Sequence, residues 1–215
     1  MAKLYFKYGV MGSSKTAQAL MSKFNFEEKG KKVWLIKPAI DNRDGEDIIK
    51  SRIGLEQKAT VIGKEDSILE KFSEKDTDVI ICDEAQFFSE EQIDELRGIS
   101  VDSDIPVVCF GLRTDFANKL FPGSKRLFEL ADTFEEIKSM CRCGKKATVN
   151  ARLDSEGHIV TEGDQVVIGG NEQYVGMCWA CKQKAIEKDK AVKRFKMART
   201  AKPFIPQNEE TKKAE

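Results

Sequence analysis

The apolar positions along the chain fall into short runs that alternate with amphipathic segments. The apolar runs predict strands at residues 4–8, 32–37, 59–62, 77–82 and 105–110. The intervening segments predict helices at residues 17–24, 67–72 and 89–99, the last with a capping box of Ser89 and Gln92. Residues 38–55 are polar with little apolar periodicity, which indicates a loop or a mobile segment. Alternating strands and helices predict an α/β fold with a parallel sheet, whose ligands bind at the carboxyl ends of the strands.

A glycine-bearing stretch, G-V-M-G-S-S-K-T at Gly9 to Thr16, joins the first strand to the first helix. This is the layout of a phosphate-binding loop, because glycine lets backbone N–H groups approach a phosphate and a helix N-terminus favours negative charge. Lys15 is expected to reach the β- and γ-phosphates, and the Thr16 hydroxyl to bind magnesium. The alternative is a Gly-Ser loop before a capped helix, since Ser14 stands where the strict pattern has glycine.

The fourth apolar run ends in two acids, in the sequence V-I-I-C-D-E at residues 79–84. An acid at the end of an apolar strand is the usual partner of a phosphate-binding loop, where it holds the shell of a magnesium ion. We therefore assign Asp83 to the metal, and Glu84 to accepting a proton from an attacking hydroxyl or water. Two exposed acids at a strand end are the alternative interpretation.

Four cysteines form two close pairs, Cys141 with Cys143 and Cys178 with Cys181. Four thiolates predict a tetrahedral, structural zinc site with no open coordination position. A redox C-x-x-C is the alternative, although it would not need the second pair. The 34 residues between the pairs predict a small β-rich flap, with a hairpin at the turn sequence D-S-E-G of residues 154–157.

Two further features lie near the predicted ligand edge of the sheet. Gly169 and Gly170 permit close approach of the backbone to a ligand, with an ordinary glycine loop as the alternative. Aromatic residues follow the ends of two strands, and they predict either core packing or the floor of a pocket for a flat base. These aromatic residues are Phe87, Phe88, Phe116 and Phe121.

Charge and composition narrow the range of partners. The chain of 215 residues carries 36 basic and 36 acidic side chains, so we expect no bulk attraction to nucleic acid or to membranes. The N-terminus has no apolar core of signal-peptide length, and no apolar run approaches a membrane span. Six cysteines without a secretory signal indicate a reducing compartment, so we expect a cytoplasmic protein.

The motifs in their order resemble the type II thymidine kinases of bacteria. The resemblance rests on G-V-M-G-S-S-K-T, D-E-A-Q-F at 83–87, G-L-R-T-D-F at 111–116, the two cysteine pairs and V-I-G-G-N-E-Q-Y at 167–174. It covers residues 1–190 and implies transfer of the ATP γ-phosphate to the 5′-hydroxyl of thymidine, giving dTMP in nucleotide salvage. It also implies Mg²⁺, a structural Zn²⁺, a RecA-like P-loop core and a homotetramer. We divide the chain into a P-loop domain (1–138), a zinc-binding lasso domain (139–190) and a disordered charged tail (191–215).

The resemblance also implies roles for individual residues, with Glu84 as the catalytic base. The implied nucleotide site comprises Gly9, Val10, Met11, Gly12, Ser13, Ser14, Lys15, Thr16, Asp41, Arg43, Asp83, Glu84, Ala85 and Gln86. The implied thymidine site comprises Met11, Phe87, Leu112, Phe116, Phe121, Val167, Ile168, Gly169, Gly170, Asn171 and Tyr174. The implied metal ligands are Cys141, Cys143, Cys178 and Cys181 for zinc, and Thr16 and Asp83 for magnesium.

Ser14 departs from the family pattern, which usually has glycine at this position. If the backbone there has a positive φ, serine costs about 1 kcal/mol of strain, and ATP affinity is lowered.

Two other classes of function stay open at this point. The sequence D-E-A-Q resembles a helicase motif, which favours a P-loop ATPase or helicase-like domain with a structural zinc ribbon. A helicase core needs two RecA-like domains, however, and this chain has length for one. The third class is a zinc-ribbon nucleic-acid binder that uses the basic C-terminal segment.

Overall fold

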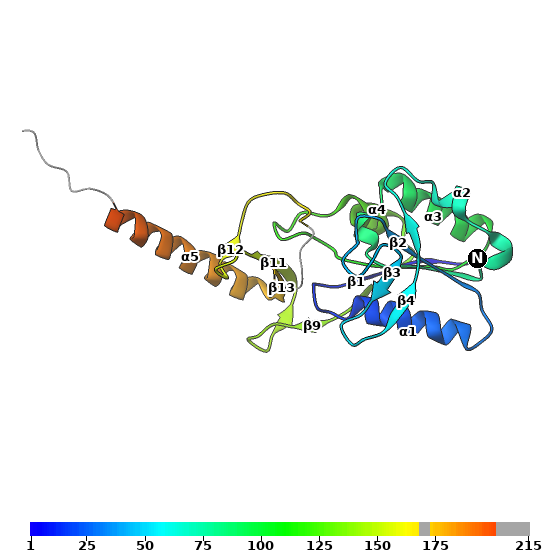
Figure 1. Ribbon diagram of the computed structural model, residues 1–215, viewed down its shortest axis with the longest axis horizontal. Helices are drawn as coiled ribbons and strands as arrows, with labels where there is room; N and C mark the ends of the chain where they lie inside the picture. Colours follow the sequence, from blue (N-terminus) through cyan, green and yellow to red (C-terminus); the bar gives the residue numbers. More distant parts are fainter. Residues whose placement is uncertain (168–172, 201–215) are drawn as a thin grey trace, which may run out of the picture.

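A parallel sheet forms the centre of the molecule (Figure 1). The computed structural model describes residues 1–167 and 173–200, the last nine of them by their backbone alone. In spatial order the strands are β5 (Thr60–Ile62), β2 (Val33–Pro38), β6 (Val79–Cys82), β7 (Val107–Gly111), β1 (Leu4–Tyr8) and β8 (Thr133–Glu136). Every neighbouring pair is parallel. The predicted parallel α/β sheet is confirmed, and β8 adds an edge strand that the sequence did not predict.

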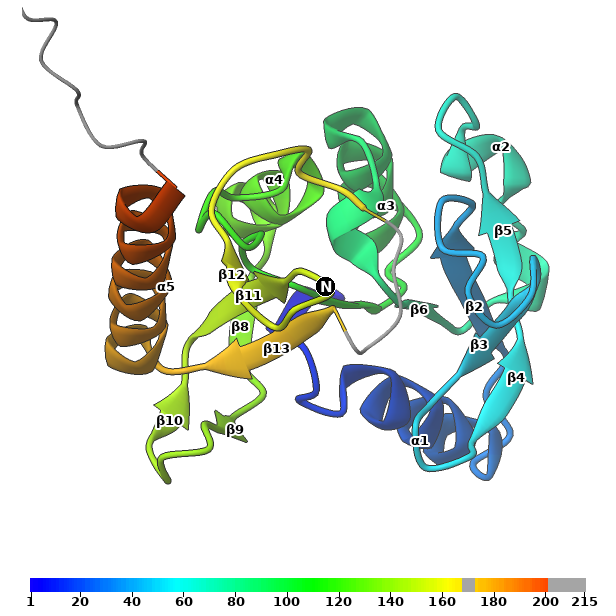
Figure 2. The same cartoon turned by 60° about the vertical axis from the view of Figure 1, so that its left-hand side comes forward.

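The two faces of the sheet carry two separate parts of the core, because successive side chains of a strand point to opposite faces. On β6, Ile80 packs in one cluster and Ile81 in the other. The first face is covered by α2 (Ile68–Lys71), α3 (Glu90–Asp102) and α4 (Pro122–Leu130), and the second by α1 (Lys15–Glu27) (Figure 2). Two single 3₁₀ turns connect the layers, η1 (Glu74–Asp76) and η2 (Ala85–Phe87).

The start of α3 shows the predicted capping box. The Ser89 hydroxyl accepts a hydrogen bond from the backbone N–H of Gln92 at 3.2 Å, and the Gln92 side chain accepts one from the backbone N–H of Ser89 at 3.1 Å. Two of the orphan donors at the helix start are thereby satisfied, as the sequence predicted.

The polar stretch at residues 38–55, predicted to be a loop, contains a strand. β3 (Ile48–Lys50) pairs antiparallel with β4 (Glu56–Lys58) in a two-stranded hairpin. All three β4 residues are exposed, so the pair has almost no apolar pattern to reveal it. Its anchors are the buried Ile49 and a hydrogen bond from the Lys37 ammonium to the Ile48 carbonyl oxygen at 2.8 Å.

The C-terminal part forms a second, β-rich module. Its elements are β9 (Ser139–Met140), β10 (Lys146–Ala147), β11 (Val149–Leu153), β12 (Ile159–Val160), β13 (Tyr174–Met177) and α5 (Trp179–Thr200). The hairpin predicted at residues 154–157 is confirmed by the antiparallel pairing of β11 with β12.

The last helix corrects the predicted tail. α5 continues to Thr200 and projects away from the sheet (Figure 1), so residues 191–200 are helical where the sequence predicted disorder. Residues 201–215 of that tail lie outside the described residues.

Candidate active site

The loop between β1 and α1 turns too tightly for any residue other than glycine at its start. A Cβ on Gly9 would lie 2.3 Å from the Ser13 hydroxyl and 2.8 Å from the Ile137 carbonyl oxygen. The buried Lys15 side chain folds into this loop, and its ammonium group donates to the Val10 carbonyl oxygen at 2.9 Å. The loop therefore holds a cation at its centre, where a phosphate oxygen would be an alternative partner.

Ser14, the N-cap of α1, adopts the left-handed conformation, with φ 64° and ψ 24°. Its side chain makes no capping hydrogen bond that would offset the strain of a Cβ in this region. The positive φ on which the predicted strain at Ser14 depends is therefore present.

A cavity of about 580 Å³, partly open to solvent, lies over the loop. It is lined by Met11 to Ala17 together with Arg43, Ser51, Arg52, Ile53 and Glu84. Arg52, on the β3–β4 hairpin, has a guanidinium nitrogen 3.4 Å from the place where a Cβ on Gly12 would lie. Lys15, Arg43 and Arg52 thus bring three cationic side chains to one cavity, which suits a polyphosphate.

Asp83 follows β6 and is 3% exposed. Burial, and then the charge of Glu84, raise the pKa of its carboxyl group to about 7. The Thr16 hydroxyl donates a hydrogen bond to this carboxylate, and Asp83 Oδ1 has no hydrogen-bond partner among the described residues. A buried oxygen without a partner beside a hydroxyl is the donor set that a magnesium ion prefers, so the residues present fit the predicted cation.

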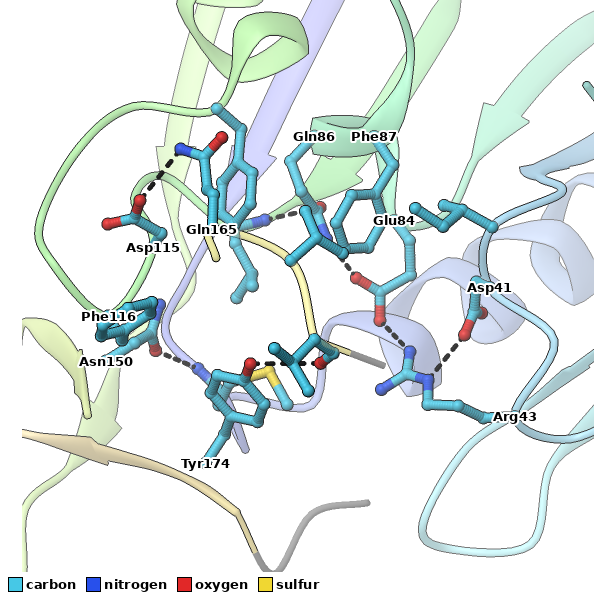
Figure 3. Close-up of a pocket in the computed structure, with 16 residues that line it drawn as sticks. Asp41, Arg43, Glu84, Gln86, Phe87, Asp115, Phe116, Asn150, Gln165 and Tyr174 are labelled. Carbon is cyan, nitrogen blue, oxygen red and sulfur yellow. Dashed lines mark hydrogen bonds and ion pairs between the residues drawn. The ribbon is translucent and has the colours of Figure 1, made fainter. Parts of the chain in front are cut away.

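Glu84 occupies the centre of a network of short hydrogen bonds (Figure 3). One carboxylate oxygen accepts from Arg43 at 2.6 Å, and the other accepts from the Gln86 amide at 2.6 Å. Burial opposes ionisation, but the charges of Arg43 and Lys15 outweigh it and lower the pKa of Glu84. Arg43 is held in turn by Asp41 at 2.6 Å. Glu84 is therefore an ionised acceptor with a fixed orientation.

A second cavity, of about 610 Å³ and also partly open, lies beside the first. Seven of the residues predicted to bind substrate line it: Met11, Phe87, Leu112, Phe116, Phe121, Val167 and Tyr174. The rings of Phe87 and Phe121 meet edge to face, with centroids 5.6 Å apart. Flat aromatic and apolar walls of this kind suit a planar base.

Arg152 supports one wall of this cavity from β11. Its guanidinium carbon lies 3.9 Å from the centroid of the Phe116 ring, a cation–π contact. The same side chain donates to the backbone oxygens of Asp164 at 2.8 Å and Glu162 at 3.2 Å. It therefore fixes the aromatic wall and the beginning of the segment that crosses the cavity.

The segment that crosses the cavity is held at both of its described ends. The Gln165 amide donates to Asp115 at 2.9 Å, and the Tyr174 hydroxyl donates to the Val167 carbonyl oxygen at 3.1 Å (Figure 3). Ile168, Gly169, Gly170 and Asn171, also predicted to contact substrate, lie outside the described residues.

The four paired cysteines converge in the second module. Their sulfur atoms all lie within 4.8 Å of one another, and those of Cys143 and Cys178 are 3.7 Å apart. A tetrahedron with Zn–S bonds of about 2.3 Å has sulfurs about 3.8 Å apart, so the cluster fits zinc. Backbone N–H groups of Cys143 and Cys178 donate to the Cys141 sulfur and lower its pKa to about 6. Such donors stabilise the thiolate form that a metal needs.

The family model and the relatives of similar sequence agree on one family. The family model described as "Thymidine kinase" matches residues 2–182. The thymidine kinase of Shewanella oneidensis is 42% identical over 182 residues, which cover 83% of this chain and 95% of that protein. The thymidine kinase of Yersinia pestis is 43% identical over 182 residues, covering 83% of this chain and 93% of that protein. The chain belongs to the thymidine kinase family.

Among solved structures, the Pif1 helicase from Candida albicans overlaps 64% of this chain and 36% of its own, with 16% sequence identity and a TM-score of 0.37. An overlap this small supports no argument about the helicase alternative. The thymidine kinase family model, in contrast, matches nearly the whole described chain.

The nucleotide-contacting run predicted at residues 83–86 is divided by the fold. Asp83 lies beside Thr16 and Ala85 is buried in the core, and neither Asp83 nor Ala85 lines either cavity. Gln86 and Asp41 line the second, apolar-walled cavity rather than the cavity over the Gly9 to Thr16 loop. Direct contacts of Ala85, Gln86 and Asp41 with a nucleotide therefore stay predictions.

Sequence reasoning missed several polar residues of the site. Arg52 lay in a stretch interpreted as a loop, where a cation between two short segments was the only signal. Asp115, Asn150 and Gln165 line the apolar cavity. Asp115 lies within the motif at 111–116 but was assigned no role, and no local pattern identifies Asn150 or Gln165. Among the helices that the structure describes, none combines the length and the apolar character needed to cross a membrane.

Proposed function

We propose that this chain transfers the γ-phosphoryl group of ATP to the 5′-hydroxyl of thymidine. The observation that carries the proposal is that the two cavities adjoin, because Met11, Arg43 and Glu84 line both. A triphosphate on the loop and a nucleoside in the apolar cavity would bring the γ-phosphate and the hydroxyl together beside Glu84. Positioning of this kind is most of what phosphoryl transfer requires of a protein.

Glu84 is the proposed base. Because Arg43 keeps the carboxylate ionised at neutral pH, it can accept a hydrogen bond from the 5′-hydroxyl and take its proton late in the transfer. Arg43 is itself close enough to the phosphate cavity to interact with the transferred group.

Lys15, Arg52, Thr16 and Asp83 are the proposed phosphate and magnesium residues. Lys15 would exchange its backbone acceptor at Val10 for phosphate oxygens. Thr16 and Asp83 would hold magnesium, which when bound neutralises charge on the phosphates.

The four cysteines are proposed to hold a structural zinc, because four protein ligands leave no position for a substrate. The segment from Val167 to Tyr174 is proposed to close over the base. On the family resemblance we further propose a cytoplasmic homotetramer that needs no nucleic-acid partner. Light scattering of the purified chain tests the tetramer.

Release of ADP with and without thymidine tests the function. We expect slow ADP release without a nucleoside, since water is not placed where the 5′-hydroxyl belongs, and rapid release with thymidine. Glu84→Gln keeps the shape but removes the basicity, so kcat should fall about 10²- to 10⁴-fold with little change in ATP affinity. Asp83→Asn should also weaken magnesium-dependent ATP binding. Rapid turnover without thymidine would favour an ATPase instead.

A further inference from the structure

The second module touches the phosphate loop directly, in addition to forming one side of the apolar cavity. Val10 of the loop is buried in one apolar cluster with Cys141, Cys178 and Ala147. A residue of the predicted nucleotide loop therefore shares its packing with the cysteines of the metal cluster.

The N–H and the carbonyl oxygen of Met11 both lie against one cross-strand pair. Asn150 on β11 lies opposite Gly176 on β13. The Asn150 side chain accepts a hydrogen bond from the Met11 N–H at 2.8 Å (Figure 3). A Cβ on Gly176 would lie 2.8 Å from the Met11 carbonyl oxygen and 2.7 Å from Val10 Cγ2, so only glycine allows the strand this close.

Asn150 is itself fully engaged. Its side-chain amide donates to the Thr114 carbonyl oxygen at 2.8 Å, and its backbone oxygen accepts from the buried Lys182 ammonium of α5 at 3.0 Å. The residue is 3% exposed, so its orientation is set by these three partners rather than by water. It joins the phosphate loop, the loop after β7 and the start of α5.

We propose that β11 and β13 brace the phosphate loop, with Asn150 and Gly176 as positioning residues that set nucleotide affinity. Met11 lines both cavities and precedes Gly12, which has a φ of +76° and lies in the turn of the proposed phosphate loop. Holding Met11 fixes the direction of the backbone N–H groups that follow. The inference rests on the proposed function, because it takes the loop to be the nucleotide site.

Calorimetric titration of ADP with magnesium, and of thymidine, into three variants tests the brace. Asn150→Ala leaves the Met11 N–H without its acceptor, and Gly176→Ala forces the strand and loop apart. Each should raise the Kd for ADP about tenfold, with zinc content at the wild-type value. In Gly176→Ala, whose residue lines neither cavity, the Kd for thymidine should change less than about threefold. Asn118→Gly is the matched control. It removes another acceptor of Lys182 but tolerates the φ of 65°, and it should leave ADP affinity unchanged.

Hydrogen exchange of the Met11 amide in the wild type needs no variant to fold, and we expect slow exchange. Fast exchange would overturn the brace, as would ADP affinities of Asn150→Ala and Gly176→Ala within twofold of wild type. An equal loss of ADP and thymidine affinity in Gly176→Ala would also overturn it, since that result indicates general loosening. A wild-type chain that binds no ADP would instead refute the proposed function.

Discussion

At the scale of single residues, backbone strain is concentrated where the chemistry is proposed. Four non-glycine residues in the described chain have a positive φ, and two of them are Ser14 and Glu84. Neither conformation is common for a residue with a Cβ, so the surrounding fold must hold both. Glu84 is held by Arg43 and Gln86, whereas the Ser14 side chain makes no capping hydrogen bond.

Ser14→Gly should therefore raise the stability of the protein or its affinity for ATP. Removing the Cβ relieves about 1 kcal/mol of strain, which we expect to appear as a higher melting temperature or as ATP affinity improved up to about fivefold. Differential scanning calorimetry and ATP titration measure the two quantities. Ser14→Ala is the control, because it removes the hydroxyl but keeps the Cβ. An equal gain from alanine would show that strain is not the cause.

Asp83 should make the stability of the magnesium-free protein depend on pH. Its folded pKa of about 7 lies above the unfolded value near 3.9, so the folded state binds this proton more tightly. The free energy of unfolding should then fall as the pH rises from about 4 to about 7. Glu84 has the opposite effect. Because its folded pKa is lowered, its contribution to the free energy of unfolding is lost only as the pH falls below this window.

Urea denaturation at pH 5 and pH 8 measures this effect. Asp83→Asn should lose less stability across the interval than wild type, whereas Asp94→Asn, at an exposed site, should follow wild type. Identical pH profiles of Asp83→Asn and wild type would contradict the assignment.

At the scale of helices and strands, the sequence predicted those features that depend on residues close together in the chain. The strand, glycine loop and helix at Gly9 to Thr16, the capping box of α3 and the turn before β12 depend on neighbouring residues, and each is present. The cysteine pairs needed only their spacing to indicate a common site, which the convergence of their sulfurs confirms.

The elements that were missed depend on distant partners. The sequence of α4 begins with Pro122 and Gly123, which resembles a turn, but proline is favourable at the first helical position. A Cβ on Gly123 would lie 2.6 Å from the Phe88 carbonyl oxygen, so the glycine serves packing against η2. Asn150 contacts Met11, which lies 139 residues away in the sequence. Arg52 lies on a polar hairpin that shows no apolar pattern. Hydrophobic periodicity cannot predict contacts of either kind.

The cluster of four cysteines should influence the binding of both ligands. A lasso function alone predicts that Cys178→Ser weakens nucleoside binding more than ATP binding. Because Cys178 packs with Val10 of the phosphate loop, we expect Kd to rise severalfold for ADP as well. Elemental analysis should find about one zinc per wild-type chain. Trp179→Ala, at an exposed neighbour, is the control, and ADP affinity unchanged in zinc-free Cys178→Ser would contradict this prediction.

At the scale of the whole molecule, the proposed site belongs to neither module alone. The phosphate cavity is built by the sheet domain and its hairpin, while the apolar cavity takes Phe116 and Phe121 from that domain and Asn150 and Tyr174 from the second module. The cluster of Val10 with the cysteines joins the two parts through buried apolar contact. We therefore expect the modules to unfold together rather than separately.

Thymidine should stabilise both modules in a single transition. At a concentration of 100 times Kd, a ligand that binds only the folded state adds about 2.7 kcal/mol, which for a chain of this length raises Tm by about 5–10 °C. The temperature at which zinc is released, followed with a chromogenic chelator, should rise by as many degrees as the Tm from circular dichroism, because we expect the ligand to contact both parts. Deoxyadenosine at equal concentration is the control, since a cavity closed by Val167, Tyr174 and Phe116 should exclude a purine by size. Two separate transitions, with only one shifted by thymidine, would show that the modules are independent. An equal shift from deoxyadenosine would show instead that the cavity does not select its base.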